Sequence, residues 1–210
     1  MGAGQQTQGA VVDGRTARAL RTREAIVDAC IGLVNEGVYK PTAPRIAERA
    51  SVSVRSVFQH FDDLETLFAM VAERAVGQLA GLFEPIDADL PLPDRVLRFA
   101  SERRAVLEAM TPIRRAAAVH APFSKEIQSR LEAGHEFLRS ELARVFAHEL
   151  DAAPAGERED LLDVLDTVAS WSTWENLRTV NRRSPAASEA LLVRMVRSAL
   201  APSEAAAPVR

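Results

Sequence analysis

Residues 43–61, APRIAERASVSVRSVFQHF, contain two short helical patterns separated by a turn. Thr42 precedes the first pattern as a candidate N-cap, and Pro44 lies in its first turn, where the missing N–H does no harm. Ser53 is the candidate N-cap of the second pattern. The sequence therefore predicts one helix over about residues 43–50 and another that begins after Ser53.

This pair of helices meets the packing conditions of a steep crossing. Two short helices joined by a tight turn need small residues where their backbones approach, and Ala47 and Ala50 provide them. The apolar side chains expected to fill the space beneath the crossing are Ile46, Val52, Val57 and Phe61. Such an arrangement is a helix-turn-helix unit, in which the second helix is held outward as a rigid rod.

The second helix carries hydrogen-bonding groups on its expected outward side. Its outward positions are Val54, Arg55, Ser56, Gln59 and His60. A helix fits the major groove of B-DNA, where arginine can bond guanine O6 and N7 together and glutamine can do the same to adenine N6 and N7. Solvated polar residues on an ordinary surface helix are the alternative interpretation. The caps, the small crossing residues and the local charge favour a DNA-reading helix.

Charge is distributed unevenly along the chain, whose formal net charge is −3. Residues 1–61 contain 8 Lys/Arg and 5 Asp/Glu, a balance of +3, whereas residues 62–210 contain 18 and 24, a balance of −6. A basic module attached to an acidic body is typical of a protein that presents one end to phosphates. The basic end is the one that contains the helix pair.

Composition favours one class of fold. Hydrophobic residues make up 47% of the 210 residues, enough for a large core, and the abundant Ala, Leu, Arg and Glu favour helix over strand. No apolar run reaches the roughly 20 residues of a membrane span, and a single cysteine, Cys30, fits a reducing compartment. We therefore expect an all-α, cytoplasmic protein without membrane attachment.

The sequence contains no recognisable motif for catalysis or metal binding. The four histidines, His60, His120, His135 and His148, form no H-x-x-x-H pair, and there is no cysteine cluster. Neither a glycine-rich phosphate loop nor a G-x-S-x-G elbow occurs. We expect no catalytic residue, no cofactor and no metal, which makes a small all-α enzyme the weaker alternative.

Helical periodicity extends over most of the chain. Four helices are expected in the N-terminal part, at about residues 17–36, 43–50, 54–61 and 64–83. A proline-rich loop at residues 84–93 separates them from five further helices, at about residues 94–111, 113–121, 124–150, 157–181 and 185–200. Pro112 is expected to end the first of these five helices, which gives about nine helices in total.

The sequence of residues 23–67 resembles that of the TetR-type bacterial transcriptional regulators. The resemblance rests on the pattern I-A-x-x-A-x-V-S-x-x-S-x-F-x-H-F, which begins at Ile46 and ends at Phe61. It implies a homodimeric repressor whose N-terminal three-helix domain binds a near-palindromic operator in double-stranded DNA. It also implies a helical C-terminal domain that pairs with a second copy and often holds a small organic effector.

Together these observations predict four segments. Residues 1–17 are a flexible arm, residues 18–66 the helix-turn-helix domain, residues 67–202 a helical bundle for ligand binding and dimerisation, and residues 203–210 a flexible tail. The predicted DNA contacts are Thr42, Arg45, Ser53, Val54, Arg55, Ser56, Gln59 and His60. A helical adaptor that binds protein instead of DNA would keep the same fold and remains an alternative.

Three positions depart from the usual pattern of the TetR type. Ser51 stands in the interhelical turn where the family usually has glycine, and because serine takes a strained turn conformation only at some cost, a slightly different turn shape is expected. Phe58 stands where a tyrosine hydroxyl commonly bonds a phosphate, and Leu64 stands where a lysine commonly does. Because phosphate contacts supply much of the affinity, other groups must replace these two. The candidates are Thr42, Arg45, His60 and the arginines Arg15, Arg18, Arg21 and Arg23.

The last two predicted helices carry more apolar residues than one neighbouring helix can cover. A helix that is apolar on more than one side needs a second partner, so these helices are the predicted dimer interface. The predicted interface residues are Leu161, Leu165, Val168, Leu191, Leu192 and Met195. An ordinary core within one chain is the alternative interpretation.

Effector binding is predicted between the helices of the C-terminal domain. The candidate lining residues combine apolar surface with a few polar groups, as suits a small organic ligand: Phe99, Arg103, Met110, His120, Phe123, Phe137 and Trp174. Arg103 and His120 are the groups expected to orient an anionic or hydroxylated ligand. Each of these residues, taken alone, also fits plain core packing.

Overall fold

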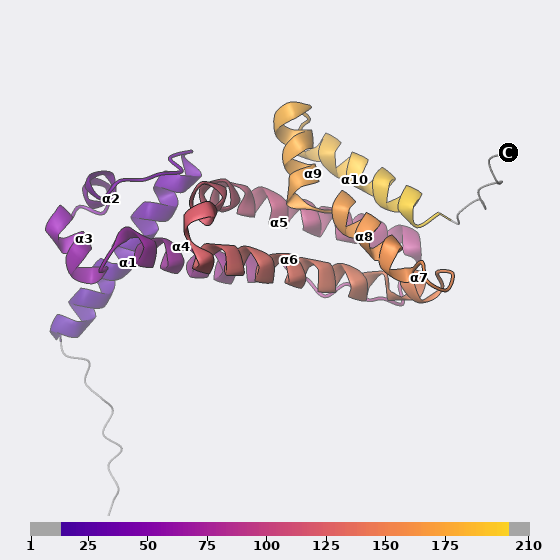
Figure 1. The fold of residues 1–210 in the computed structure, drawn as a ribbon, viewed down its shortest axis with the longest axis horizontal. Helices are drawn as coiled ribbons and strands as arrows, with labels where there is room; N and C mark the ends of the chain where they lie inside the picture. The colour runs from indigo at the N-terminus through magenta and orange to yellow at the C-terminus, as the bar shows by residue number, and fades with distance from the viewer. Residues whose placement is uncertain (1–13, 202–210) are drawn as a thin grey trace, which may run out of the picture. The chain divides into compact units, whose positions relative to one another are not determined.

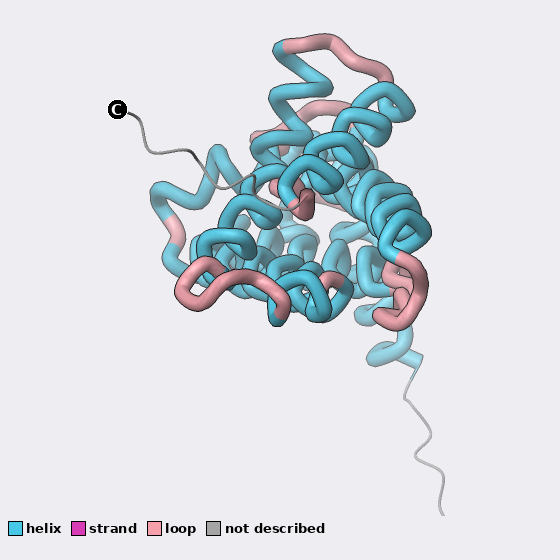
Figure 2. The backbone as a smooth tube through the Cα atoms, turned by 90° about the vertical axis from the view of Figure 1, so that its right-hand side faces the viewer, coloured by secondary structure: helices cyan, strands magenta, loops and turns pink. Residues whose placement is uncertain are grey.

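A computed structural model of the protein describes residues 14–201, and this part of the chain is helical without any strand (Figure 1, Figure 2). The all-α prediction is therefore confirmed. Contacts divide the chain into two compact units, one ending at Glu73 and the other beginning at Arg74. The predicted flexible arm and tail lie outside the described residues, except that residues 14–17 already belong to a helix. Within residues 14–201, no helix is long and apolar enough to cross a membrane.

The N-terminal unit contains α1 (Gly14–Asn35), α2 (Ala43–Arg49), α3 (Val54–His60) and the first part of α4 (Leu64–Ala80). Helices α1, α2 and α3 contact one another. The buried side chains of this unit include Ile26, Cys30, Ile46, Ala47, Val57, Phe61 and Leu67. Burial raises the pKa of the Cys30 thiol to about 12, so the thiol stays protonated and acts as a small apolar group.

The turn between α2 and α3 closes with a left-handed residue. The Val52 N–H donates to the Ala47 carbonyl at 2.9 Å, and the Ser51 N–H donates to the Glu48 carbonyl at 3.1 Å. This pair of bonds is a Schellman motif, which requires a positive φ at the residue after the C-cap. That residue is Ser51, with φ of 55°. Serine therefore takes the left-handed conformation in this turn at a cost in backbone strain.

Replacing Ser51 by glycine is expected to stabilise the helix pair by about 0.5–1 kcal/mol. Relief of the left-handed strain, about 1–2 kcal/mol, outweighs the extra entropy of glycine in the unfolded chain, about 0.5–1 kcal/mol. Hydrogen exchange of the α2 and α3 amides should slow about 2- to 5-fold. Ser51→Val, which places a β-branched residue at the same φ, should accelerate it, and acceleration by both variants would contradict the assignment of strain.

Six α-helices form most of the described C-terminal unit: α5 (Leu92–His120), α6 (Lys125–Val145), α7 (Ala147–Asp151), α8 (Arg158–Val168), α9 (Trp171–Glu175) and α10 (Pro185–Ala199). A 3-10 turn, η1 (Ala121–Phe123), joins α5 to α6, and a π turn, η2 (Asn176–Val180), follows α9. Helix α5 runs beside α6 and also packs against α10 (Figure 1). The core of this unit includes Val96, Phe99, Leu142, Phe146, Leu150, Leu162, Leu165, Leu192 and Val196.

Pro112 does not end a helix, which corrects the prediction of separate helices at residues 94–111 and 113–121. Helix α5 continues through it. Side chains on both sides of the proline hold the same neighbouring segment. Glu108 accepts hydrogen bonds from Trp174 Nε1 at 2.8 Å and from Arg178 Nε at 2.7 Å, while Arg115 binds Glu175 through two bonds of 3.0 Å. These tertiary contacts brace the helix across a residue that weakens it locally.

The helix predicted at residues 124–150 is interrupted at Phe146. Its φ of −109° and ψ of 26° are not helical, and its buried ring meets Phe99 edge to face with centroids 5.2 Å apart. Arg95 Nη1 donates to the Val145 carbonyl at 2.7 Å. In a continuous helix that carbonyl would accept from the backbone N–H of Glu149. A tertiary contact thus takes over the helical bond, and α7 begins as a separate helix.

The helix predicted at residues 157–181 is also divided. Helix α8 ends at Val168, and Ser170 then caps α9, its hydroxyl accepting from the Thr173 N–H at 3.1 Å. The signal for this break is present in the sequence, because serine in an extended conformation is a preferred N-cap. Because the apolar periodicity continues across this break, the sequence pattern predicted a single helix.

Candidate nucleic-acid interface

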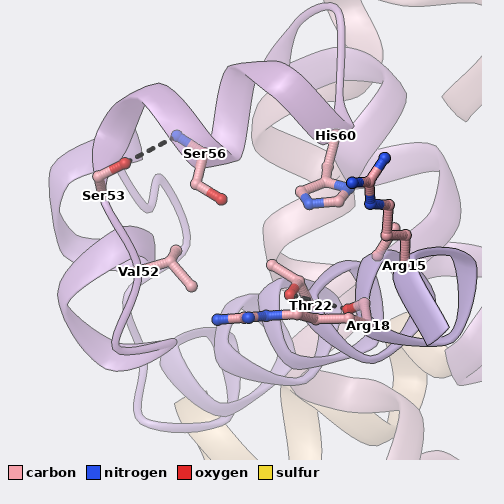
Figure 3. A pocket seen from close by; sticks show the side chains of 8 residues that line it. Arg15, Arg18, Thr22, Val52, Ser53, Ser56 and His60 are labelled. Carbon is pink, nitrogen blue, oxygen red and sulfur yellow. Dashed lines mark hydrogen bonds between the residues drawn. The ribbon is translucent and has the colours of Figure 1, made fainter.

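Helix α3 has three distinct faces. Val57 and the following Phe61 are buried beneath the helix. The face that we call the reading face is exposed and consists of Val54, Arg55, Phe58 and Gln59. The third face carries Ser53, Ser56 and His60 and turns toward α1 (Figure 3). The predicted outward residues are therefore at the surface, with Ser56 and His60 half-buried.

Local bonds fix the position of α3. Ser53 caps the helix, its Oγ accepting from the Ser56 N–H at 3.0 Å. At the other end, Arg23 of α1 donates to the His60 carbonyl at 3.4 Å and to the Met70 sulfur at 2.8 and 3.2 Å. Its guanidinium also lies over the Phe61 ring, 4.8 Å from the centroid. Arg23 thus holds α3 and α4 in place, which corrects its prediction as a replacement phosphate contact.

The two other predicted contacts lie at the start of α2. Thr42 occupies the N-cap position with an extended backbone, as predicted, but its side chain makes no capping bond. Arg45 lies in the first turn, and both side chains are exposed. A hydroxyl and a guanidinium at an exposed helix start suit contact with a phosphate.

Phe58 and Leu64 stand where the TetR type commonly has a phosphate-binding side chain. Neither side chain offers a hydrogen-bonding group. The Phe58 ring is 49% exposed on the reading face, where it offers only apolar surface. Leu64 begins α4 as a half-buried side chain. The reading face therefore supplies Arg55 as its single cation, together with the Gln59 amide and the apolar surface of Val54 and Phe58.

A cleft of about 500 Å³, here called the α1–α3 cleft, lies beside the reading helix. Side chains from α1 form one wall and residues from α3 and its N-cap form the other (Figure 3). Its lining residues with polar side chains are Arg15, Arg18, Thr22, Ser53, Ser56 and His60. Sequence reasoning singled out all of these except Thr22, which a spacing of seven residues places on the same side of α1 as Arg15.

Among the predicted effector-binding residues, Phe99 and Arg103 lie together, with the guanidinium 4.8 Å from the centroid of the ring. Phe99 belongs to the core, Arg103 Nη2 donates to the Leu138 carbonyl at 3.0 Å, and the buried Trp174 binds Glu108. Met110 and His120 are half-buried, and Phe137 is exposed and meets Phe83 edge to face. Phe123 is 86% exposed, which corrects the prediction that it lines a space between helices.

The predicted dimer residues separate into two groups. Leu165 and Leu192 are fully buried in the core of the unit, so they are corrected to intrachain packing residues. Leu161, Val168, Leu191 and Met195 remain half-buried at its edge. Val164 lies between Leu161 and Val168 on α8, is 48% exposed, and was not predicted. Within residues 14–201, no group of three His, Cys, Asp or Glu side chains is arranged to hold a metal ion.

Solved structures with a similar fold include several bacterial and archaeal regulators. A TetR-family transcriptional regulator from Streptomyces coelicolor matches with a TM-score of 0.67 at 19% sequence identity, over 86% of this chain and 79% of that one. A protein assigned to the same family from Mesorhizobium loti matches with a TM-score of 0.65 at 24% identity, over 88% and 97% of the two chains. A TetR transcription regulator from Haloarcula marismortui gives a TM-score of 0.62 at 19% identity, over 85% and 96%.

Comparison at the level of sequence gives no match. No protein-family model matches the chain, and neither does any curated protein. The structural likeness extends over most of the chain and over nearly the full length of two of the three regulators. The chain has the fold of the TetR-family transcriptional regulators.

Proposed function

We propose that this protein is a DNA-binding transcriptional regulator of the TetR type. The observation that carries the proposal is the exposed pair of Arg55 and Gln59, one helical turn apart on a short helix that Ser53 and Arg23 hold in place. A rigid helix that presents a guanidinium and an amide side by side matches the hydrogen-bond pattern of base edges in a major groove. In this role the protein catalyses no reaction. It is a repressor that a small molecule releases from its operator.

DNA binding of this kind requires two copies of the chain. A dimer places two α3 helices in successive major-groove faces, so the operator is a near-palindrome with half-sites about 34 Å apart or a multiple of this. Footprinting of the purified protein on genomic DNA should recover such sites. Gel-shift titration at two salt concentrations should show selective binding, and an equal affinity for all duplexes would favour the adaptor alternative.

The dimer surface that we propose is an apolar stripe on α8 and α10. Leu161, Val164 and Val168 share one side of α8, since their spacing of three and four residues follows the helical period. Leu191 and Met195 lie one turn apart on α10, which packs against α8. All five side chains keep part of their surface exposed in the single chain. A second copy with the same stripe would cover this surface symmetrically.

Replacing Val164 by glutamate is expected to convert the dimer to a monomer at micromolar concentration. A carboxylate buried without a partner in an apolar contact costs several kcal/mol, so the dissociation constant of the dimer should rise at least about 100-fold. Sedimentation velocity measures the change. Leu97→Glu is the control, because Leu97 is an equally exposed apolar residue of α5 outside the stripe, at 50% exposure. A wild-type protein that sediments as a monomer would overturn the assignment.

The effector is proposed to bind in the C-terminal unit, with Arg103 as its orienting group. The guanidinium is buried and lies 4.8 Å from the centroid of the Phe99 ring. Burial lowers the pKa of Arg103 to about 10, which leaves it charged at neutral pH and suited to an anionic ligand. A compound that weakens operator binding tenfold must bind the DNA-free form ten times more tightly, so titration in both states identifies it.

A further inference from the structure

The thioether of Met70 on α4 is the acceptor for a charged group of α1. Arg23 Nη2 and Nε donate to the Met70 sulfur at 2.8 and 3.2 Å. A thioether is a weak acceptor, whereas a guanidinium is a strong donor whose best partners are carboxylates and phosphates. The contact therefore joins a cation to a polarizable atom whose acceptor strength changes when it is oxidised.

The same guanidinium connects this sulfur to the end of the reading helix. Arg23 Nη1 donates to the His60 carbonyl at 3.4 Å, and the guanidinium carbon lies 4.8 Å from the centroid of the Phe61 ring. His60 is the last residue of α3, and Phe61 is its C-cap. All of these groups belong to the N-terminal unit. A chemical change at the Met70 sulfur therefore reaches the end of α3 through a single side chain.

A small oxidant has access to this side chain. Met70 and Arg23 are both half-buried, so neither is closed off from solvent. The two N–H groups on the sulfur belong to one planar fork and approach it from the same side, which leaves the second lone pair for an electrophile. The thiol of Cys30 does not compete, because it is fully buried and burial raises its pKa to about 12, which leaves almost no thiolate to react.

We propose that Met70 is an oxidation site through which a two-electron oxidant such as hydrogen peroxide weakens operator binding. The sulfur lone pair attacks one peroxide oxygen, so that an S–O bond forms and the O–O bond breaks. The proton of the transferred oxygen passes to the departing hydroxide, which leaves as water. Sulfur is thereby oxidised by two electrons to the sulfoxide, and the peroxide is reduced. The inference rests on the proposed function, since its consequence is measured in operator binding.

Oxidation removes the contact that Arg23 makes with α4. Electron density in a sulfoxide moves from sulfur to oxygen, so the sulfur no longer attracts the guanidinium, and the new acceptor oxygen forms on the side away from Arg23. Reaching that oxygen takes the guanidinium away from the His60 carbonyl and the Phe61 ring. Without reaching it, Arg23 loses its bonds to α4. Either outcome loosens the end of α3 and with it the positions of Arg55 and Gln59.

The first test treats full-length variants with hydrogen peroxide and measures operator affinity before and after. The chain has four methionines, and the double variant Met110→Leu/Met195→Leu keeps only Met1 and Met70. Once mass spectrometry shows the sulfoxide at Met70, the double variant and the wild type should bind operator about 10-fold more weakly. A methionine sulfoxide reductase should restore the affinity.

Met70→Leu is the matched control, because leucine keeps the apolar bulk without an oxidisable atom. Its affinity should not change on treatment, whatever its starting value, and circular dichroism should show that it stays helical. An equal loss in Met70→Leu would overturn the proposal. Resistance of Met70 to peroxide that oxidises Met110 and Met195 in the wild type would overturn it as well.

The second test asks whether Arg23 carries the effect. Arg23→Gln should weaken operator binding of the untreated protein about as much as oxidation does, and peroxide treatment should then cost this variant little. Arg21→Gln removes an exposed arginine of the same helix and should keep the full response to peroxide. Losses from Arg23→Gln and from oxidation that simply multiply would show that Arg23 is not the connection.

A third measurement is made without DNA. The Phe61 N–H donates to the Val57 carbonyl at 3.0 Å and closes the last turn of α3. Its hydrogen exchange should accelerate about 10-fold when Met70 is oxidised and stay unchanged in treated Met70→Leu. An untreated protein that binds no duplex selectively would overturn the proposed function and this inference with it. Selective operator binding and α3 exchange that both ignore oxidation of Met70 would overturn this inference alone.

Discussion

Replacing Arg95 by alanine is expected to lower the free energy of unfolding of the C-terminal unit by about 3–5 kcal/mol. Arg95 is only 4% exposed and connects three segments of the unit. Its Nε donates to the Leu90 carbonyl at 2.9 Å, Nη1 donates to Val145, and the guanidinium holds Glu149 through bonds of 2.6 and 2.8 Å. Truncation leaves these partly buried acceptors without their donor, and it removes the contact that ends α6.

Denaturant unfolding followed by tryptophan fluorescence measures this loss. The two tryptophans of the chain, Trp171 and Trp174, both lie in the C-terminal unit and therefore report on it. Arg158→Ala is a matched control, because Arg158 forms ion pairs with Asp151 and Glu159 on the exposed surface. The control should lose less than about 1 kcal/mol. If Arg95→Ala and Arg158→Ala lost a similar free energy of unfolding, burial would not be what makes the Arg95 ion pair more stabilising than the exposed pairs of Arg158.

The pH dependence of stability should report the same pair. The hydrogen bonds from Arg95 hold the pKa of Glu149 below its usual value near 4.5. A carboxylate whose folded-state pKa is lowered adds stability above its unfolded pKa and loses that stability as the pH falls through the folded value. The difference in stability between the wild type and Glu149→Gln should therefore be constant at neutral pH and shrink below about pH 4.5. A difference that grows toward low pH would contradict the pairing.

Replacing Arg55 by alanine is expected to weaken operator binding by about 1–3 kcal/mol, which corresponds to about 5- to 150-fold. The side chain is exposed on the reading face and lies one turn before Gln59. A guanidinium that bonds guanine O6 and N7 together discriminates against every other base, because the wrong base leaves its donors unpaired. The loss should therefore concentrate at one base pair of each half-site.

Binding to a set of operators with single base changes checks this expectation. For the wild type, changing the guanine read by Arg55 should cost about as much as the mutation itself, and for Arg55→Ala the same change should cost little. Arg98→Ala, which removes an exposed arginine of α5, is the control for net charge and should alter affinity by less than about 2-fold. Uniform weakening on all duplexes would make Arg55 a phosphate contact instead.

Local sequence signals were sufficient for the N-terminal unit. The N-cap positions of Thr42 and Ser53, the small residues Ala47 and Ala50 and the apolar positions predicted the bounds of α2 and α3 to within a residue or two. The cost of a serine in this turn was anticipated, and Ser51 takes the left-handed conformation with φ of 55°. These features are decided over four to seven residues, where spacing and capping chemistry dominate. The same periodicity predicted the exposure of Val54, Arg55 and Gln59, but it did not predict that of Phe58.

Contacts between distant residues decided what the sequence pattern alone could not. Pro112 is tolerated because Glu108 and Arg115 hold the segment that follows α8, and α6 ends where Arg95 takes the Val145 carbonyl, 50 residues away. Arg23 was predicted as a phosphate contact and instead binds His60 and Met70, and Leu165 and Leu192 are core residues.

The physical reason for this division is that periodicity specifies which side of a helix is apolar but not what covers it. A long polar side chain likewise has no preferred partner until the fold brings a carbonyl, sulfur or ring within its reach. The sequence by itself therefore determined the helices of the N-terminal unit and the outward positions Val54, Arg55 and Gln59 of α3. Only the tertiary structure decided which apolar residues remain exposed and that Arg15 and Arg18 line one cleft beside the reading helix.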